Sequence, residues 1–178
     1  PRGRAGGQPF ITDAAVNIAP TVREKADIVQ NAIELAHVLG VPEPKVAILA
    51  AVETVNPDMQ ATVDAAMLCK MADRGQITGG VLDGPLAFDN AVSIAAARTK
   101  GIASPVAGQA DVLVVPDLES GNMLAKQLIY LGNAESAGVV LGAKVPIILT
   151  SRADSRETRL ASCAIALLLA HRYRQIPP

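Results

Sequence analysis

Residues 45–51 read KVAILAA and residues 110–116 read ADVLVVP, and these two stretches decide the fold. Each is a short, continuous apolar run, which is typical of a β-strand that is covered on both faces. Around them the chain alternates helical and strand patterns, which predicts βαβ units with right-handed crossovers. The expected fold is therefore α/β, with three layers (α/β/α) around a mostly parallel sheet.

The first expected helix shows how clear these patterns are. Thr21 and Glu24 form a capping box, an apolar stripe at helical spacing follows, and Gly40 ends the helix after Leu39. The same reading predicts further helices and strands. The helices are expected at 56–75, 90–98, 123–131 and 154–173, and the strands at 80–85, 137–141 and 145–149, with a turn at 84–85.

Composition excludes several classes of protein. The 178 residues suit one domain or two small ones, and with 50% apolar but only 2% aromatic residues the core must be aliphatic. The formal charge is −1 and no basic stripe is visible, which argues against a nucleic-acid partner. Cys69 and Cys163 lie far apart without a CxxC motif, so neither a disulfide scaffold nor a thiolate metal site is expected.

No membrane partner is expected either. The longest apolar run, near residues 160–170, is shorter than the ~20 residues that a membrane span needs. Residues 1–7 carry charge but no hydrophobic signal core follows them. A cytoplasmic protein is the resulting expectation.

Ligands of parallel sheets bind at the carboxyl ends of the strands, so polar residues after each expected strand are candidate site residues. In the first such cluster, Gly84-Pro85 predicts a sharp exit from the strand, and Asp83 or the Gly84 amide would contact a substrate. The structural alternative is that Asp83 only ends the strand and that Asp89 caps the next helix.

The second cluster, residues 116–122, reads PDLESGN. Free N–H groups at a helix start, with Gly121 allowing close backbone approach, would form an anion site that includes Asn122, and Lys126 would add a positive charge one turn later. Capping by Ser120 or Asn122 alone explains the same residues. Neither a GxGxxG nor a Walker pattern is present.

The third cluster, residues 150–156, reads TSRADSR. Thr150 and Ser151 offer hydroxyls, Arg152 suits two-pronged contact with phosphate or carboxylate, and Asp154 is a candidate base. A capped helix with surface arginines is the alternative. A triad of Ser151, Asp154 and His171 is disfavoured because no GxSxG motif exists. The residues alone predict binding of a phosphorylated or carboxylated small molecule.

Four stretches in order resemble the phosphate acetyl/butyryltransferase family, above all its phosphate butyryltransferase branch and the transferase half of bifunctional enoyl-CoA hydratase/phosphate acetyltransferases. The stretches are ITDAAVNIAPT (11–21), DGPLAFDNA (83–91), VLVVPDLESGNMLAKQL (112–128) and VVLGAKVPIILTSRADS (139–155). The resemblance implies an architecture like that of isocitrate/isopropylmalate dehydrogenases. It implies conversion of acyl-CoA and phosphate to acyl phosphate and CoA, with CoA as a substrate and no metal or redox cofactor.

The resemblance also implies roles for particular residues. Ser151 and Arg152 match the family's Ser-Arg pair, which binds phosphate and the transition state. In the acetyl branch the proposed catalytic aspartate lies six residues beyond that Arg, where this chain has Thr158. Asp154 is the nearest carboxylate, and its role as the base that deprotonates the CoA thiol is a hypothesis. A CoA-binding arginine of that branch corresponds to Tyr130.

Family members are longer than this chain and have an N-terminal α/β region before the ITDAA stretch. The chain is therefore expected to be the carboxyl-terminal portion of such an enzyme. Residues 1–9 would be a divergent head, residues 10–144 a second-domain-like part, and residues 145–178 the last strand and helix, which would pack on the N-terminal region. We expect weak or no turnover from the chain alone, and association as a homodimer or with that region.

Two other functions stay open at this stage. A non-catalytic domain that keeps the fold for CoA binding or assembly would show the same stretches. A hydroxy-acid dehydrogenase on the related architecture would need a nicotinamide-binding loop and metal-binding aspartates, and neither is recognisable in the sequence.

Overall fold

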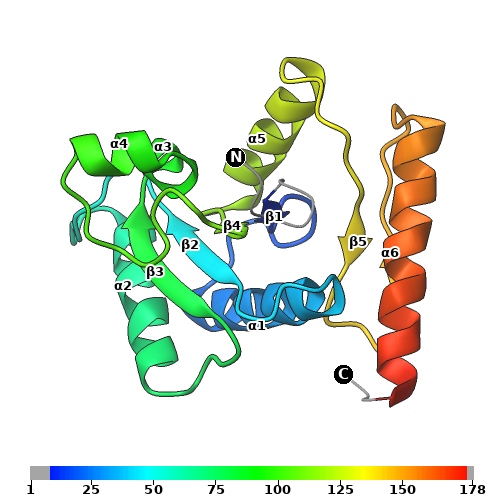
Figure 1. Cartoon of the computed structure of the whole chain (residues 1–178), viewed down its shortest axis with the longest axis horizontal. Helices are drawn as coiled ribbons and strands as arrows, with labels where there is room; N and C mark the ends of the chain where they lie inside the picture. The colour runs from blue at the N-terminus through cyan, green and yellow to red at the C-terminus, as the bar shows by residue number, and fades with distance from the viewer. Residues whose placement is uncertain (1–8, 176–178) are drawn as a thin grey trace. The chain divides into compact units, whose positions relative to one another are not determined.

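The computed structural model describes residues 9–175 and shows an α/β chain (Figure 1). The described residues divide into two compact units with the boundary between Asn122 and Met123, and α5 (Leu118–Tyr130) runs across it. Within the described residues, no helix is long and apolar enough to cross a membrane.

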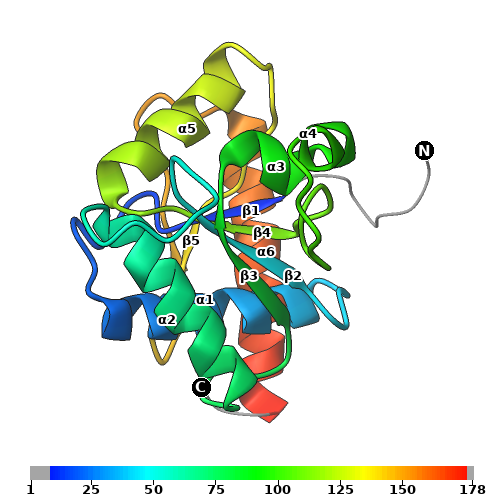
Figure 2. The ribbon, with the colours of Figure 1, turned by 90° about the vertical axis from the view of Figure 1, so that its left-hand side faces the viewer.

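The first unit is built on a four-stranded sheet in the order β1-β4-β2-β3, in which every neighbouring pair is parallel. Helices α1 and α2 lie on one side of this sheet, and α3 and α4 lie on the other (Figures 1 and 2). The strands are β1 (Phe10–Thr12), β2 (Lys45–Leu49), β3 (Val81–Leu86) and β4 (Val112–Val114). The helices are α1 (Val22–Val38), α2 (Gln60–Asp73), α3 (Phe88–Val92) and α4 (Ile94–Thr99). The prediction of an α/β fold with a mostly parallel sheet is confirmed.

The core of this unit is aliphatic, as the composition predicts. Val46 and Val112 on neighbouring strands, Val29 and Ile33 on α1 and Leu68 on α2 are all fully buried in one cluster. The two sequence stretches that predicted the sheet thus supply its central strands, β2 and β4. Burial of these side chains is the main stabilising contribution to the unit.

The capping box at the start of α1 is confirmed. The Glu24 backbone N–H donates to Thr21 Oγ1 at 3.4 Å, and the Thr21 backbone N–H donates to Glu24 Oε2 at 2.7 Å. These bonds satisfy amide groups that the first turn of a helix otherwise leaves without partners. The box fixes where the chain enters α1, and this entry segment borders the groove described below.

The predicted exit from β3 at Gly84-Pro85 is wrong, because β3 continues to Leu86. The pairing with β2 shifts between Ala47 and Leu49 instead, so the sheet absorbs an irregularity without ending. A Cβ at Gly84 would lie 2.8 Å from both the Cβ and the carbonyl oxygen of Ile48. Glycine is therefore required here by the close approach of β2, rather than by a turn.

The helix expected at 90–98 is divided into α3 and α4. Ser93 has an extended backbone (φ −122°, ψ 112°), and its Oγ accepts a hydrogen bond from the Ala96 N–H at 3.2 Å. A serine side chain that bonds the backbone in this way starts a new helix rather than continuing the old one. The cap therefore lies at Ser93, whereas Asp89, the expected cap, lies inside α3, which begins after Ala87.

The second unit contains most of α5, a two-stranded antiparallel pair and the long helix α6 (Arg156–Gln175). The pair consists of β5 (Val139–Val140) and β6 (Ile147–Ile148), and both strands contact α6. Both expected strands are present, although each is shorter than predicted. Buried Ser162 joins α6 to the segment before β5, because its Oγ accepts from the Gly138 N–H at 3.0 Å and donates to the Thr158 carbonyl at 2.8 Å.

Candidate functional site

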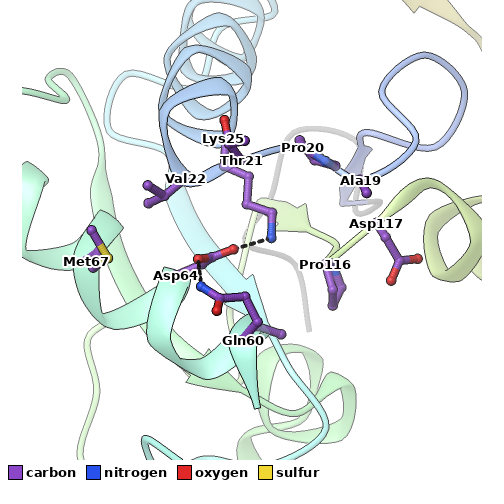
Figure 3. A pocket seen from close by; sticks show the side chains of 11 residues that line it. Ala19, Pro20, Thr21, Val22, Lys25, Gln60, Asp64, Met67, Pro116 and Asp117 are labelled. Atoms are coloured by element: carbon purple, nitrogen blue, oxygen red, sulfur yellow. Dashed lines mark hydrogen bonds and ion pairs between the residues drawn. The ribbon is translucent and has the colours of Figure 1, made fainter. Parts of the chain in front are cut away.

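A groove of about 680 Å³ opens in the first unit where three neighbouring strands end (Figure 3). Its walls are the segments that follow β1, β2 and β4, which are adjacent in the sheet. This is the edge at which doubly wound sheets bind their ligands. The lining residues are Ala19, Pro20, Thr21, Val22, Lys25, Gln60, Ala61, Asp64, Met67, Pro116 and Asp117.

The polar floor of the groove is an ion pair between two helices. Lys25 Nζ on α1 donates to Asp64 Oδ2 on α2 at 2.7 Å, and Gln60 Nε2 donates to Asp64 Oδ1 at 2.7 Å. Only 7% and 6% of the Lys25 and Asp64 side chains are exposed. A buried charge is tolerated when it is paired and hydrogen-bonded, and both Asp64 oxygens meet that condition.

Lys25 keeps hydrogen-bonding capacity that the protein does not use. An ammonium group has three N–H donors, and among residues 9–175 only Asp64 accepts from it. Sequence reasoning did not single out Lys25, Gln60 or Asp64. Lys25 and Asp64 are 39 positions apart, and nothing in the local pattern of either helix indicates that they meet.

On another wall of the groove, Asp117 caps α5. Its Oδ1 accepts from the Ser120 N–H at 2.8 Å and from the Ser120 hydroxyl at 2.9 Å. Helix α5 consequently begins at Leu118, and the Gly121 N–H donates to the Asp117 carbonyl at 3.1 Å. The expected helix start at Met123 is therefore wrong, and Gly121 and Asn122 lie inside α5, where the Gly121 amide is already engaged.

Gly121 and Asn122 hold the loop after β1 against α5. A Cβ at Gly121 would lie 2.8 Å from the carbonyl oxygen of Asp13, and Asn122 Nδ2 donates to the Ala14 carbonyl at 3.2 Å. Asp13 organises that loop, since its carboxylate accepts from the backbone of Ala15 and two following residues and from one side chain. Burial alone would raise the pKa of Asp13, but these hydrogen bonds outweigh it and hold the pKa below its ordinary value.

The cluster Asp83-Gly84-Pro85 lies within β3 and is not part of the groove lining. The Gly84 N–H donates to Asp83 Oδ1 at 2.8 Å, and the Cys69 thiol contacts the Gly84 carbonyl at 3.7 Å. Burial, followed by the charges of Asp83 and Asp73, raises the pKa of Cys69 to about 12. This thiol is therefore unsuited to act as a nucleophile at neutral pH.

A charged network surrounds buried Asn90 in the same unit. Lys100 Nζ lies 2.8 Å from Glu53 Oε1 and 3.1 Å from Asp89 Oδ2, and Asn90 Nδ2 donates to Glu53 Oε1. Asp89, the expected helix cap, is thus an ion-pair partner of Lys100. The network joins the loop after β2 to α3 and α4.

The hydroxyl–arginine cluster lies in the second unit, in the turn between β6 and α6. The Ser151 N–H donates to Asp154 Oδ2 at 2.5 Å, and the Asp154 N–H donates to the Ser151 carbonyl at 3.1 Å. Ser155, rather than Asp154, caps α6, because its Oγ accepts from the Thr158 N–H at 3.1 Å. Asp154 is therefore free of the capping role that the sequence left open.

Arg152 is exposed in this turn, and no ion pair involves it within the part of the chain that the structure describes. Thr150 is also exposed, and so is Lys126 on α5. The turn thus presents a guanidinium, two hydroxyls and a carboxylate to solvent. Across residues 9–175, no three His, Cys, Asp or Glu residues come together in a way that would hold a metal ion.

The sequence model of a family described as "Phosphate acetyl/butaryl transferase" matches residues 4–167. The chain belongs to this family. A phosphate acetyltransferase of Rhizobium meliloti is 67% identical over 93% of this chain and 52% of its own length. A probable phosphate butyryltransferase of Bacillus subtilis is 56% identical over 92% of this chain and 55% of its own length.

The solved structures of the phosphate acetyl/butyryltransferase family agree with the fold. A branched-chain phosphotransacylase from Enterococcus faecalis V583 is 41% identical, with a TM-score of 0.83 over 91% of this chain and 58% of that chain. The EutD phosphotransacetylase from Staphylococcus aureus is 26% identical with a TM-score of 0.78. The chain spans about half the length of the curated relatives it matches.

Proposed function

We propose that this chain carries out its part of acyl transfer between CoA and inorganic phosphate. The proposal is supported by relatives named phosphate acetyltransferase and phosphate butyryltransferase. The observation that carries it in the structure is the turn at 151–154. There the exposed Arg152 follows the Ser151 hydroxyl, and the Asp154 carboxylate is not used to cap a helix. Arg152 and Ser151 would bind phosphate, because a guanidinium group can make two parallel hydrogen bonds to a phosphate group.

The chemistry needs one proton transfer and one exchange of bonds at the acyl carbon. In the direction of acyl-CoA synthesis, the CoA thiol gives its proton to Asp154, and the thiolate attacks the carbonyl carbon of the acyl phosphate. A C–S bond forms, and the C–O bond to phosphate breaks. Arg152 and the hydroxyls of Thr150 and Ser151 stabilise the negative charge that develops on the carbonyl and phosphoryl oxygens.

Asp154 is suited to this step by its hydrogen bonds. Its Oδ2 accepts from the Ser151 N–H, which orients the carboxylate. Its Oδ1 has no partner among residues 9–175 and is open to receive a proton. Thr158, which occupies the position of the family's aspartate, donates its own N–H to Ser155 in the helix cap and has no acidic group.

The remaining residues proposed to contact substrate are more distant from the turn in sequence. They are Asp83, Gly84, Pro85, Gly121, Asn122 and Lys126. Because the amide of Gly121 is used within α5, we propose that Gly121 and Asn122 act through the shape of the loop after β1. Lys126 and the Asp83 segment are proposed as contacts to the polar groups of CoA.

We further propose that the chain works together with an N-terminal region like that of its longer relatives. Ile147 and Ile148 of β6 are 45% and 44% exposed, and α6 exposes Leu160, Leu167 and Leu168. Apolar surface of this kind is normally covered, so residues 145–178 are proposed to pack on that region and turnover of the chain alone is proposed to be weak. A homodimer and a cytoplasmic location belong to the same proposal, because both rest on the resemblance to the family.

The test combines a CoA titration with an assay of phosphate-dependent thiol release from acetyl-CoA and butyryl-CoA. We expect the chain to bind CoA and to release thiol slowly, with release that depends on phosphate and is lost in Arg152→Ala but kept in Arg156→Ala. Binding of CoA without any phosphate-dependent release, even with an N-terminal region supplied, would favour the CoA-binding or assembly domain. Failure to bind CoA would contradict both functions.

A further inference from the structure

We propose that the groove of the first unit holds the pantetheine arm of CoA, with Lys25 donating to an amide carbonyl of that arm. This inference rests on the proposed function, because it takes CoA as the substrate. It assigns the pantetheine arm to a groove whose lining includes none of the substrate contacts proposed above.

The charges of the groove disfavour phosphate groups. The lining residues carry one ammonium, on Lys25, and two carboxylates, on Asp64 and Asp117. Asp64 already engages the Lys25 charge at 2.7 Å, so a phosphate would find no unpaired cation there and would meet the charge of Asp117. Like charges brought together in a partly desolvated site repel each other, whereas a neutral polar chain escapes this cost.

The unused hydrogen-bonding groups suit amides. Lys25 has two N–H donors without partners among the described residues, and a carbonyl oxygen would accept from them. Asp117 Oδ2 and Gln60 Oε1 have no hydrogen-bond partner within residues 9–175, and each would accept from an amide N–H or a hydroxyl. The pantetheine arm carries two amides and a hydroxyl, which supply both kinds of group along one chain.

The remaining walls of the groove are apolar and come from all three segments. They include Pro20 and Val22 at the start of α1, Met67 on α2 and Pro116 after β4 (Figure 3). The methylenes and the geminal methyl groups of pantetheine would contact these surfaces. A groove with apolar walls and a few placed polar groups is the usual form of a small-molecule site.

Methionine-methyl NMR tests the placement directly. The chain has four methionines, and Met67 lines the groove, whereas Met71 and Met123 do not. With ¹³C-methyl methionine in the intact chain, titration with pantetheine and with CoA is expected to shift the Met67 resonance and leave Met71 and Met123 in place. Met67→Leu identifies the resonance.

A paired substitution tests the role of Lys25. Lys25→Met with Asp64→Leu removes both buried charges together, so that neither is left unpaired. The control is Lys70→Met with Asp73→Leu, which removes the exposed pair of α2, whose atoms lie 2.6 Å apart. We expect pantetheine affinity to fall about tenfold in the first variant and less than twofold in the control.

Each outcome decides the inference. A Met67 shift with pantetheine and CoA that weakens in the groove variant supports it. CoA binding measured by calorimetry with Met67 unmoved would overturn the groove assignment and leave the proposed function standing. A Met67 shift with inorganic phosphate but not with pantetheine would show an anion site instead, and absence of any CoA binding would overturn both proposals.

Discussion

Lys25 and Asp64 form an almost completely buried ion pair, with Nζ and Oδ2 2.7 Å apart, that ties α1 to α2 at the carboxyl edge of the sheet. Gln60 holds the second carboxylate oxygen, so the acid is fully engaged. The pair fixes the distance between the two helices whose first turns form the groove. It therefore links the stability of the fold to the shape of the candidate site.

The first prediction concerns this pair. Lys25→Met is expected to lower the free energy of unfolding by about 3–5 kcal/mol, because it leaves a buried carboxylate without its counter-charge. Lys25→Met with Asp64→Leu should recover a substantial part of that loss. Urea unfolding followed by circular dichroism measures both. In the exposed pair, Lys70→Met should change the free energy of unfolding by about 0.5 kcal/mol or less. A change in Lys25→Met as small as that in Lys70→Met would contradict the role given to the buried pair.

The second prediction concerns Gly121. Gly to Ala inside a helix ordinarily stabilises a protein, by up to about 1 kcal/mol. Here the added Cβ would lie 2.7 Å from Val115 Cγ2 and 2.8 Å from the Asp13 carbonyl oxygen. We therefore expect Gly121→Ala to destabilise the protein, by about 1–3 kcal/mol, because α5 must move away from the loop after β1. The sign of the change in urea unfolding decides, and a stabilised variant would show that the contact is absent in solution.

These two sites show what the sequence could and could not predict. The strands came from continuous apolar runs, and the start of α1 came from Thr21 and Glu24, which are three residues apart and interact locally. The sequence predicts a later start for α5 than the structure shows, because Ser120 and Asn122 are as good caps as Asp117 and only the hydrogen bonds of Asp117 decide among them.

The contacts between distant segments could not be predicted in the same way. The local sequence indicates a turn at Gly84, whereas glycine is required there by the close approach of Ile48 on the neighbouring strand. Lys25 and Asp64 are both charged helix residues, which in a single sequence are typical of solvent-exposed faces. Their burial follows from how α1 and α2 pack, and local periodicity carries no information about that arrangement.

The third prediction concerns Asp13 and pH. The pKa of Asp13 is lowered in the folded protein from the ordinary value of 3.8, so its hydrogen bonds contribute stability above that value. This contribution is lost as the pH falls through the lower pKa of the folded state. In Asp13→Asn, the urea midpoint is expected to be lower at pH 7 and to depend less on pH below about 4 than in the parent. Asp27→Asn removes an exposed carboxylate of α1 and serves as the charge-matched control, and a profile of Asp13→Asn identical to that of the parent would refute the prediction.

The fourth prediction concerns the two free cysteines. Cys69 is half-buried with its pKa raised to about 12, whereas Cys163 is exposed on α6. A thiol reagent at pH 8 is therefore expected to modify one thiol rapidly in the folded protein and the second only after unfolding in denaturant. Cys163→Ser should abolish the rapid phase and Cys69→Ser should preserve it. Rapid modification in Cys163→Ser would show that the region around Gly84 opens readily.

The last prediction concerns Asp154 as the proposed base. Asn at this position keeps an oxygen that accepts from the Ser151 N–H, as the carboxylate does at 2.5 Å, but it does not take up a proton. Asp154→Asn is therefore expected to leave the thermal unfolding temperature close to that of the parent while phosphate-dependent thiol release falls about 10²–10⁴-fold. Glu157→Gln, which neutralises an exposed carboxylate in the first turn of α6, is the matched control and should retain activity. Because the parent activity is expected to be low, both variants are compared at high protein concentration with an N-terminal region supplied. Unchanged release in Asp154→Asn would remove this residue from the mechanism and leave the proton to another group, with Arg152 and Ser151 acting only on phosphate.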